Sequence, residues 1–158
     1  MATLKDAIAA KALELYALPQ WERRSPIRPL WFVPSLWDWV DETPIMNTKV
    51  GGKTLAEHVE LMFCDFRCSS SFPAGDLKQI MPVKHGIRKM HPAKLRIYGW
   101  CPGEHQFVAV TGALEADTKS DLKLNDKKRD EVLMFIRRND LAGTVLLGDN
   151  RVVFPPQG

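Results

Sequence analysis

The segment KLRIYGWCPGEHQFVAVTGAL, residues 94–114, has the pattern of a β-hairpin. Its two arms, 94–100 and 106–114, are rich in β-branched and aromatic residues, as strands usually are. The intervening CPGEH carries Pro and Gly, the residues that tight turns favour. We therefore expect two antiparallel strands at the centre of the fold.

The first arm of this hairpin has a polar side and an apolar side. Lys94 and Arg96 lie two positions apart, so both are expected on one face of the strand. Leu95 and Ile97 then point to the opposite face, towards a core. Such a strand suits a sheet that holds an anion, but a half-exposed sheet without a ligand has the same pattern.

Helices are predicted on both sides of the hairpin in the sequence. Thr54 and Glu57 form a Thr-x-x-Glu capping box ahead of an apolar run, which predicts a helix from about residue 55 to 66. Asp126 is expected to cap a helix that runs to about Leu141. Apolar residues recur every three or four positions over residues 3–18, which predicts a further helix that ends at Pro19.

The remaining segments predict short elements. They are a strand over 30–33, a helix over 36–42, a strand over 87–90, a charged loop over 115–126, and a second hairpin in TVLLGDNRVVF that turns at Gly148–Asn150.

Composition indicates one soluble domain. The chain has 158 residues and a formal net charge of +3, a bias too small to identify a nucleic-acid-binding protein by itself. No apolar run is long enough for a membrane span, and the N-terminus lacks a cleavable signal pattern, so the cytoplasm is the expected location and no membrane is an expected partner. The three cysteines are expected to be free thiols.

Several kinds of site are disfavoured by spacing. No Cys-x-x-Cys is present, so no metal site is expected, and no cofactor is predicted. GGKT is not a phosphate loop, because Asn47 stands where the first glycine belongs. The serine tract at 69–71 lacks a nucleophile elbow. Cys101 and His105 remain a weak candidate for a thiol–imidazole pair.

Basic residues gather on either side of the hairpin's second strand. The first group precedes and enters the hairpin, and the second follows it: Lys84, His85, Arg88, Lys89, His91, Lys94 and Arg96, then Lys119, Lys123, Lys127, Lys128 and Arg129. If the two strands pair, the groups converge on one face that suits phosphates. The alternative is an ordinary solvated surface, because Asp117, Asp121, Asp126 and Asp130 dilute the charge.

The order of these segments resembles the RelE/HigB toxin superfamily, including its phage-derived branch. LWFVPSLWDWV is similar to the family's strand-to-helix entry, KLRIYGW to its Y-R-I-x-Y strand, and FVAVTGAL to the apolar strand that follows. DTKSDLKLNDKKRDEVLMFI is similar to its basic loop and C-terminal helix. The resemblance covers roughly residues 27–141.

The resemblance implies an α+β fold, with helices on one face of a small twisted antiparallel sheet. It divides the chain into an N-terminal helix and linker (1–26), the RelE/HigB-like domain (27–143), and a C-terminal hairpin and tail (144–158). Family members cut mRNA at the ribosome by attack of a 2′-hydroxyl on the adjacent phosphate, and they pair with a small antitoxin protein.

The resemblance also assigns roles to residues. Arg96 is similar to the family's sheet-borne arginine, Lys119 and Lys123 to its basic residues after the strand, and Arg88 to a basic residue earlier in the sheet. The remaining expected RNA contacts are lysines of the two basic groups: Lys84, Lys89, Lys94, Lys127 and Lys128.

A non-catalytic role on the same fold is the alternative. Glu115 and Asp117 stand near the expected phosphate site, where acidic groups repel RNA. The family's terminal catalytic Tyr or His has no match after the basic loop. The segments outside the domain suit a protein partner or self-assembly, so a phage-derived interaction or structural protein fits the sequence equally well.

Overall fold

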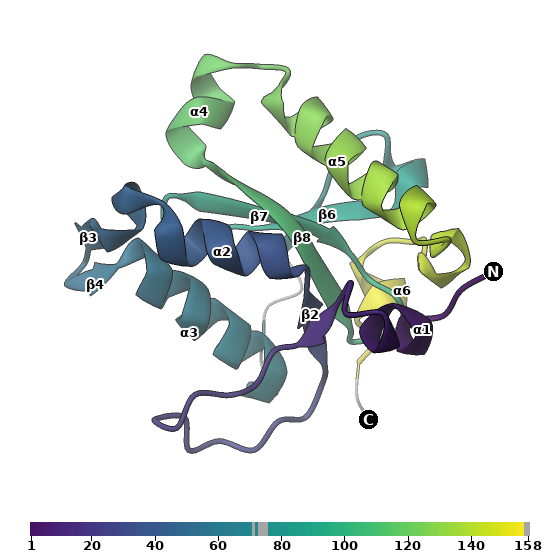
Figure 1. The fold of residues 1–158 in the computed structure, drawn as a ribbon, viewed down its shortest axis with the longest axis horizontal. Helices are drawn as coiled ribbons and strands as arrows, with labels where there is room; N and C mark the ends of the chain where they lie inside the picture. The colour runs from purple at the N-terminus through teal and green to yellow at the C-terminus, as the bar shows by residue number, and fades with distance from the viewer. Residues whose placement is uncertain (71, 73–75, 157–158) are drawn as a thin grey trace.

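In the computed structural model, which describes residues 1–70, 72 and 76–156, a six-stranded sheet in the order β1-β2-β8-β7-β6-β5 forms the centre of the molecule (Figure 1). Its strands are β1 (Glu14–Leu15), β2 (Leu30–Phe32), β5 (Leu77–Gln79), β6 (Ile87–Met90), β7 (Leu95–Trp100) and β8 (Phe107–Leu114). A separate ribbon pairs β3 (Lys49–Val50) with β4 (Lys53–Thr54). The α+β class predicted from sequence is confirmed.

The expected central hairpin is confirmed. Strands β7 and β8 pair antiparallel, from Leu95 opposite Leu114 to Trp100 opposite Val108. The register shifts at Tyr98/Gly99, which leaves one extra residue on β8. Leu95 and Ile97 are fully buried, as the alternation predicted.

The sheet is mixed, not wholly antiparallel as expected. Strand β2 runs parallel to β8, with Leu30 opposite Phe107 and Phe32 opposite Ala109. The two strands are far apart in sequence, so no local turn signal could report their relative direction. A parallel neighbour requires a long crossover, and the described residues between β2 and β8 include two α-helices and the sheet strands β5, β6 and β7.

Helices cover both faces of the sheet, which corrects the expectation of one face. Helices α2 (Pro34–Glu42) and α3 (Leu55–Cys68) pack on one side, and α5 (Leu124–Arg138) with the short α1 (Leu4–Ala9) on the other (Figure 1). The physical reason is that β7 and β8 are apolar on both faces: Ile97 lies in the α2–α3 core and Trp100 in the α5 core.

The capping box of α3 is confirmed. The Thr54 Oγ1 accepts a hydrogen bond from the Glu57 amide at 3.1 Å, and the Glu57 Oε1 accepts one from the Thr54 amide at 3.3 Å. Helix α2 begins at Pro34, two residues before the predicted start at residue 36, because proline is favoured at the first helical position.

The N-terminal helix is much shorter than predicted. It ends at Ala9, Lys11 takes a left-handed conformation with φ 59°, and the chain then extends into β1 beside β2. Leu13 and Tyr16 are buried there. Packing of Leu13 and Tyr16 into the two cores of the sheet outweighs the helical periodicity of residues 3–18.

The segment after β8 contains a helix that was predicted as a loop. Helix α4 (Glu115–Ser120) starts directly at the end of β8, and α5 follows after a short turn. Val132 and Ile136 of α5 are buried. A six-residue helix of charged and small residues has no apolar stripe, so periodicity could not detect it.

The predicted C-terminal hairpin is wrong. Residues 144–154 contain the end of a 3₁₀ turn, η4 (Ala142–Thr144), and then a helix, α6 (Asn150–Val153). Asp149 caps this helix by accepting from the Arg151 and Val152 amides. The Asp149 side chain thus starts a helix where a hairpin turn was expected. The described helices contain none that is both long and apolar enough to span a membrane.

Candidate functional site

Four basic side chains gather on one side of the sheet, and we call them, together with the buried Tyr98 beside them, the basic face: Lys78, Lys89, His91, Arg96 and Tyr98. Lys78 lies opposite Lys89, and Lys89 opposite Tyr98, across three adjacent strands. Directly opposed residues share a face of a sheet. Arg96 lies two positions before Tyr98 and therefore points the same way. Tyr98 belongs to the α5 core, so the basic face lies on the α5 side.

The charges on this face act on one another. Burial lowers the pKa of Lys89, and the nearby Arg96 and Lys78 lower it further. Burial also lowers the pKa of His91 to about 4, with Arg96, Lys89 and Lys78 adding to the effect. His91 is therefore neutral at physiological pH, and its buried Nε2 has no hydrogen-bond partner among the described residues. The positive charge of the face comes from its lysines and arginine.

Glu115 binds two of the cations that the resemblance assigned to catalysis. Its carboxylate lies 3.2 Å from Arg96 Nη2 and 2.6 Å from Lys119 Nζ. The hydrogen bond from Lys119 lowers the pKa of Glu115 most, and the Arg96 charge lowers it further. The pairing of β7 with β8 brings Arg96 near the start of α4, so one cation from each predicted basic group, Arg96 and Lys119, meets Glu115.

Tyr98 is held as a hydrogen-bond donor at the edge of the basic face. Its hydroxyl donates to Asn125 Oδ1 at 2.5 Å, and burial raises its pKa to about 12. The phenol is therefore protonated at neutral pH. Asn125 is on α5, so this contact also joins the helix to the sheet.

Arg88, which the resemblance assigned to catalysis, is buried and faces away from the basic face. Its side chain is 1% exposed. It donates to the carbonyls of Leu77 at 3.1 Å and Gly148 at 2.8 Å, and to the Asn150 side chain. Because Arg88 precedes Lys89 on β6, it points to the opposite face. The catalytic assignment of Arg88 is therefore corrected: it joins the sheet to the C-terminal segment.

The other predicted basic residues lie outside the basic face. Lys127 pairs with Asp121 at 3.0 Å, and Lys128 with Glu131 at 3.2 Å. Lys128 also lies 3.4 Å from Thr111, which is opposite Tyr98, so it borders the face. Lys123 is exposed immediately before α5, and Lys84 is exposed in η3 (Val83–His85).

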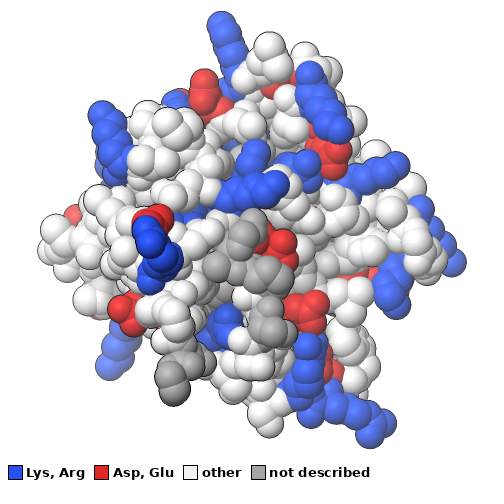
Figure 2. All heavy atoms as spheres, turned by 180° about the vertical axis from the view of Figure 1, so that it is seen from behind, with Lys and Arg blue, Asp and Glu red and all other residues white. Residues whose placement is uncertain are grey.

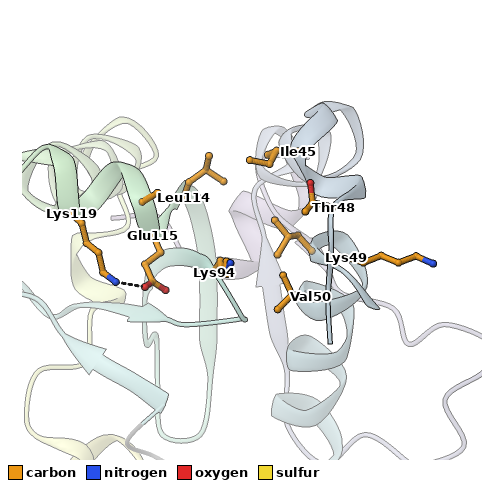
Figure 3. A pocket seen from close by; sticks show the side chains of 10 residues that line it. Ile45, Thr48, Lys49, Val50, Lys94, Leu114, Glu115 and Lys119 are labelled. Atoms are coloured by element: carbon orange, nitrogen blue, oxygen red, sulfur yellow. Dashed lines mark ion pairs between the residues drawn. The ribbon is translucent and has the colours of Figure 1, made fainter. Parts of the chain in front are cut away.

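A cavity of about 490 Å³ opens beside α4 (Figure 3). Lys94, the last predicted RNA contact, lines it together with Glu115 and Lys119. Lys94 precedes the first residue of β7 and is exposed, in contrast to the mostly buried Arg96. The two cations that the sequence placed on one strand face thus lie at different sites.

Charge over the rest of the molecule is mixed. Figure 2 shows Lys and Arg side chains spread over the face opposite that of Figure 1, with Asp and Glu between them. No group of three or more His, Cys, Asp or Glu able to hold a metal ion occurs in the described part of the chain. Burial raises the pKa of the Cys101 thiol to about 12, so it is a poor partner for His105 in nucleophilic chemistry.

Two members of the basic face, Lys78 and Tyr98, were not singled out from sequence, whereas His91 belongs to the first basic group predicted above. Lys78 lies on β5, an edge strand that was not predicted from sequence. Tyr98 is two positions from Arg96, so strand alternation alone could have placed it on the same face. Comparison with protein-family models, curated proteins and solved structures finds no match.

Proposed function

We propose that the protein binds RNA phosphates on the basic face, as a RelE/HigB-like domain, and that its activity is ribosome-dependent mRNA cleavage. One observation carries the proposal: Lys78, Lys89 and Arg96 lie on one sheet face around His91. Such a group of cations is suited to phosphate oxygens, and to the charge that develops when an oxygen attacks phosphorus.

The order of the elements supports the resemblance. A short strand, β2, leads into α2 and α3, and β6, β7 and β8 then form an antiparallel meander. The segment LRIYGW is the middle strand of that meander. Helices α4 and α5 follow, where the resemblance expected a basic loop and a helix.

The chemistry of cleavage sets requirements on this face. As the 2′-oxygen bonds to phosphorus, its proton passes to a base, the bond to the 5′-oxygen breaks, and that oxygen receives a proton. His91 is neutral at physiological pH and so has the protonation state of a base. Arg96 and Lys89 would stabilise the negative charge on the phosphorus-bound oxygens.

A non-catalytic interaction protein is the second candidate, and Glu115 favours it. This carboxylate neutralises Arg96 and Lys119 together, and Arg88 is buried. Three of the four residues assigned to catalysis by resemblance are thus occupied by contacts within the molecule. In this reading the partner is another protein or a second copy of the chain.

RNA binding tests the proposal directly. We expect the natural protein to bind a single-stranded RNA oligonucleotide at low salt, measured by fluorescence anisotropy. Lys89→Gln and Arg96→Gln should each weaken binding about tenfold, the loss expected for a charge-assisted hydrogen bond. Each should also reduce the slope of log affinity against log salt by about 0.7, the value for one phosphate contact on a single strand.

Lys53→Gln is the matched control, because it removes the same charge from β4, outside the basic face. It should leave both the affinity and the salt slope nearly unchanged. A natural protein that retains no RNA at low salt would exclude the RNA-binding proposal. RNA binding without mRNA cleavage in a translating extract, and without growth arrest on induction, would favour the second candidate.

A further inference from the structure

The cavity beside α4 has two apolar walls from segments distant in sequence. Ile45 and Val50 stand on one side, where Leu55 also contributes, and Leu114 and Ala116 on the other. Figure 3 shows these two sides facing each other across the opening. A volume of about 490 Å³ lies within the range of roughly 300–1,000 Å³ that is usual for small-molecule pockets.

Lysines supply the charge at this cavity. The Lys94 ammonium lies between the two walls and makes no hydrogen bond or ion pair with any residue that the structure describes (Figure 3). The Lys94 carbonyl accepts the Glu115 amide at 2.8 Å, so its backbone is held in place. Lys49 also borders the cavity, but its side chain points away from the opening.

The one acidic residue of the lining, Glu115, is already neutralised. One of its carboxylate oxygens pairs with Arg96 and the other with Lys119. The Lys94 charge is therefore not balanced by a described lining residue. An apolar cavity with an unbalanced cation at its opening is complementary to a molecule with an apolar body and one anionic end.

We propose that this cavity binds a small amphipathic carboxylate, whose anionic group pairs with Lys94 and whose hydrocarbon chain lies between Val50 and Leu114. The contacts differ from those proposed for RNA, because Lys94 is outside the basic face. Glu115 lines the cavity and also pairs with Arg96, so the two sites are neighbours, but the residue proposed to bind the carboxylate, Lys94, is not one proposed here to bind RNA, and each activity can be measured without the other.

Isothermal titration calorimetry with decanoate tests the inference on the full chain. Decanoate should bind more tightly than octanoate by about fourfold for each methylene, as expected for burial of the hydrocarbon. Decanol, which lacks the charge, should bind at least about tenfold more weakly than decanoate. Equal affinities for decanoate and decanol would overturn the inference, as would no binding of decanoate.

Two variants and one matched control locate the ligand. Lys94→Gln should weaken decanoate binding about tenfold and leave decanol unaffected, whereas the matched Lys49→Gln should change neither. Ala116→Trp, at an exposed α4 position, should fill the cavity and abolish binding of both ligands. If all three variants bind decanoate as tightly as the natural protein does, the ligand lies elsewhere and the inference is overturned. RNA affinity measured on the same Ala116→Trp protein should be retained.

Discussion

Glu115 controls how much positive charge is available beside the basic face, because its carboxylate pairs with Arg96 and Lys119. Glu115→Gln keeps the size of the side chain but removes its charge, which frees both cations. We expect RNA affinity at low salt to rise about five- to tenfold, and the gain to shrink as salt screens the phosphates. Anisotropy titrations at two salt concentrations measure this effect.

Asp117→Asn is the control at the same scale. Asp117 lies on α4, is exposed, and forms no ion pair with a described residue. Asp117→Asn therefore changes the net charge by the same amount as Glu115→Gln but frees no cation. It should raise RNA affinity far less than Glu115→Gln. Equal gains from the two variants would show that only net charge matters, and that Arg96 is not held back by Glu115.

The β7–β8 hairpin depends on a close approach at Gly99. A Cβ at this position would lie 1.7 Å from the Val108 carbonyl oxygen and 2.9 Å from the Phe107 ring. The obstacle is backbone, which cannot move aside without opening the strand pair at the register shift. Gly99→Ala should lower the free energy of unfolding by about 2 kcal/mol or more, in the range of overpacked cores, as measured by urea denaturation.

Gly103→Ala is the comparison within the same hairpin. The three atoms nearest to its Cβ would all belong to the flexible Gln106 side chain, at 3.2 Å or more, so the unfolding free energy should change by less than about 1 kcal/mol. If Gly99→Ala is no more destabilising than Gly103→Ala, the two strands are less closely packed at the bulge than described above.

At the scale of the whole molecule, Arg88 joins the sheet to the C-terminal segment through Leu77, Gly148 and Asn150. Arg88→Met replaces the guanidinium with an apolar side chain of similar length. It leaves the carbonyls of Leu77 and Gly148 without the hydrogen bonds that Arg88 donates. We expect the unfolding free energy to fall by roughly 2–5 kcal/mol. RNA affinity of the folded protein should be unchanged, because Arg88 is on the opposite face from Lys89.

Lys89→Gln, one residue along the same strand, should show the reverse pattern: weaker RNA binding with little change in the urea midpoint. Loss of RNA binding by Arg88→Met at an unchanged midpoint would return Arg88 to the proposed site.

Local chemistry determined several elements from the sequence alone. The Thr54–Glu57 capping box predicted the start of α3, and the CPGEH turn between two arms rich in β-branched and aromatic residues predicted the β7–β8 hairpin. These predictions succeeded because caps, turns and alternation depend on residues three to eight positions apart. For the site, sequence proximity indicated Arg96, Lys89 and Lys119, which lie on or beside the basic face.

Only the tertiary structure decided the rest. Long-range pairing placed β2 parallel to β8, turned residues after Lys11 into an edge strand, and brought Lys78 opposite Lys89. Long-range packing also put Arg88 in the interior, although the next residue, Lys89, is on the basic face. Local propensities contribute only fractions of a kcal/mol per residue, and burial against a distant strand or helix outweighs them.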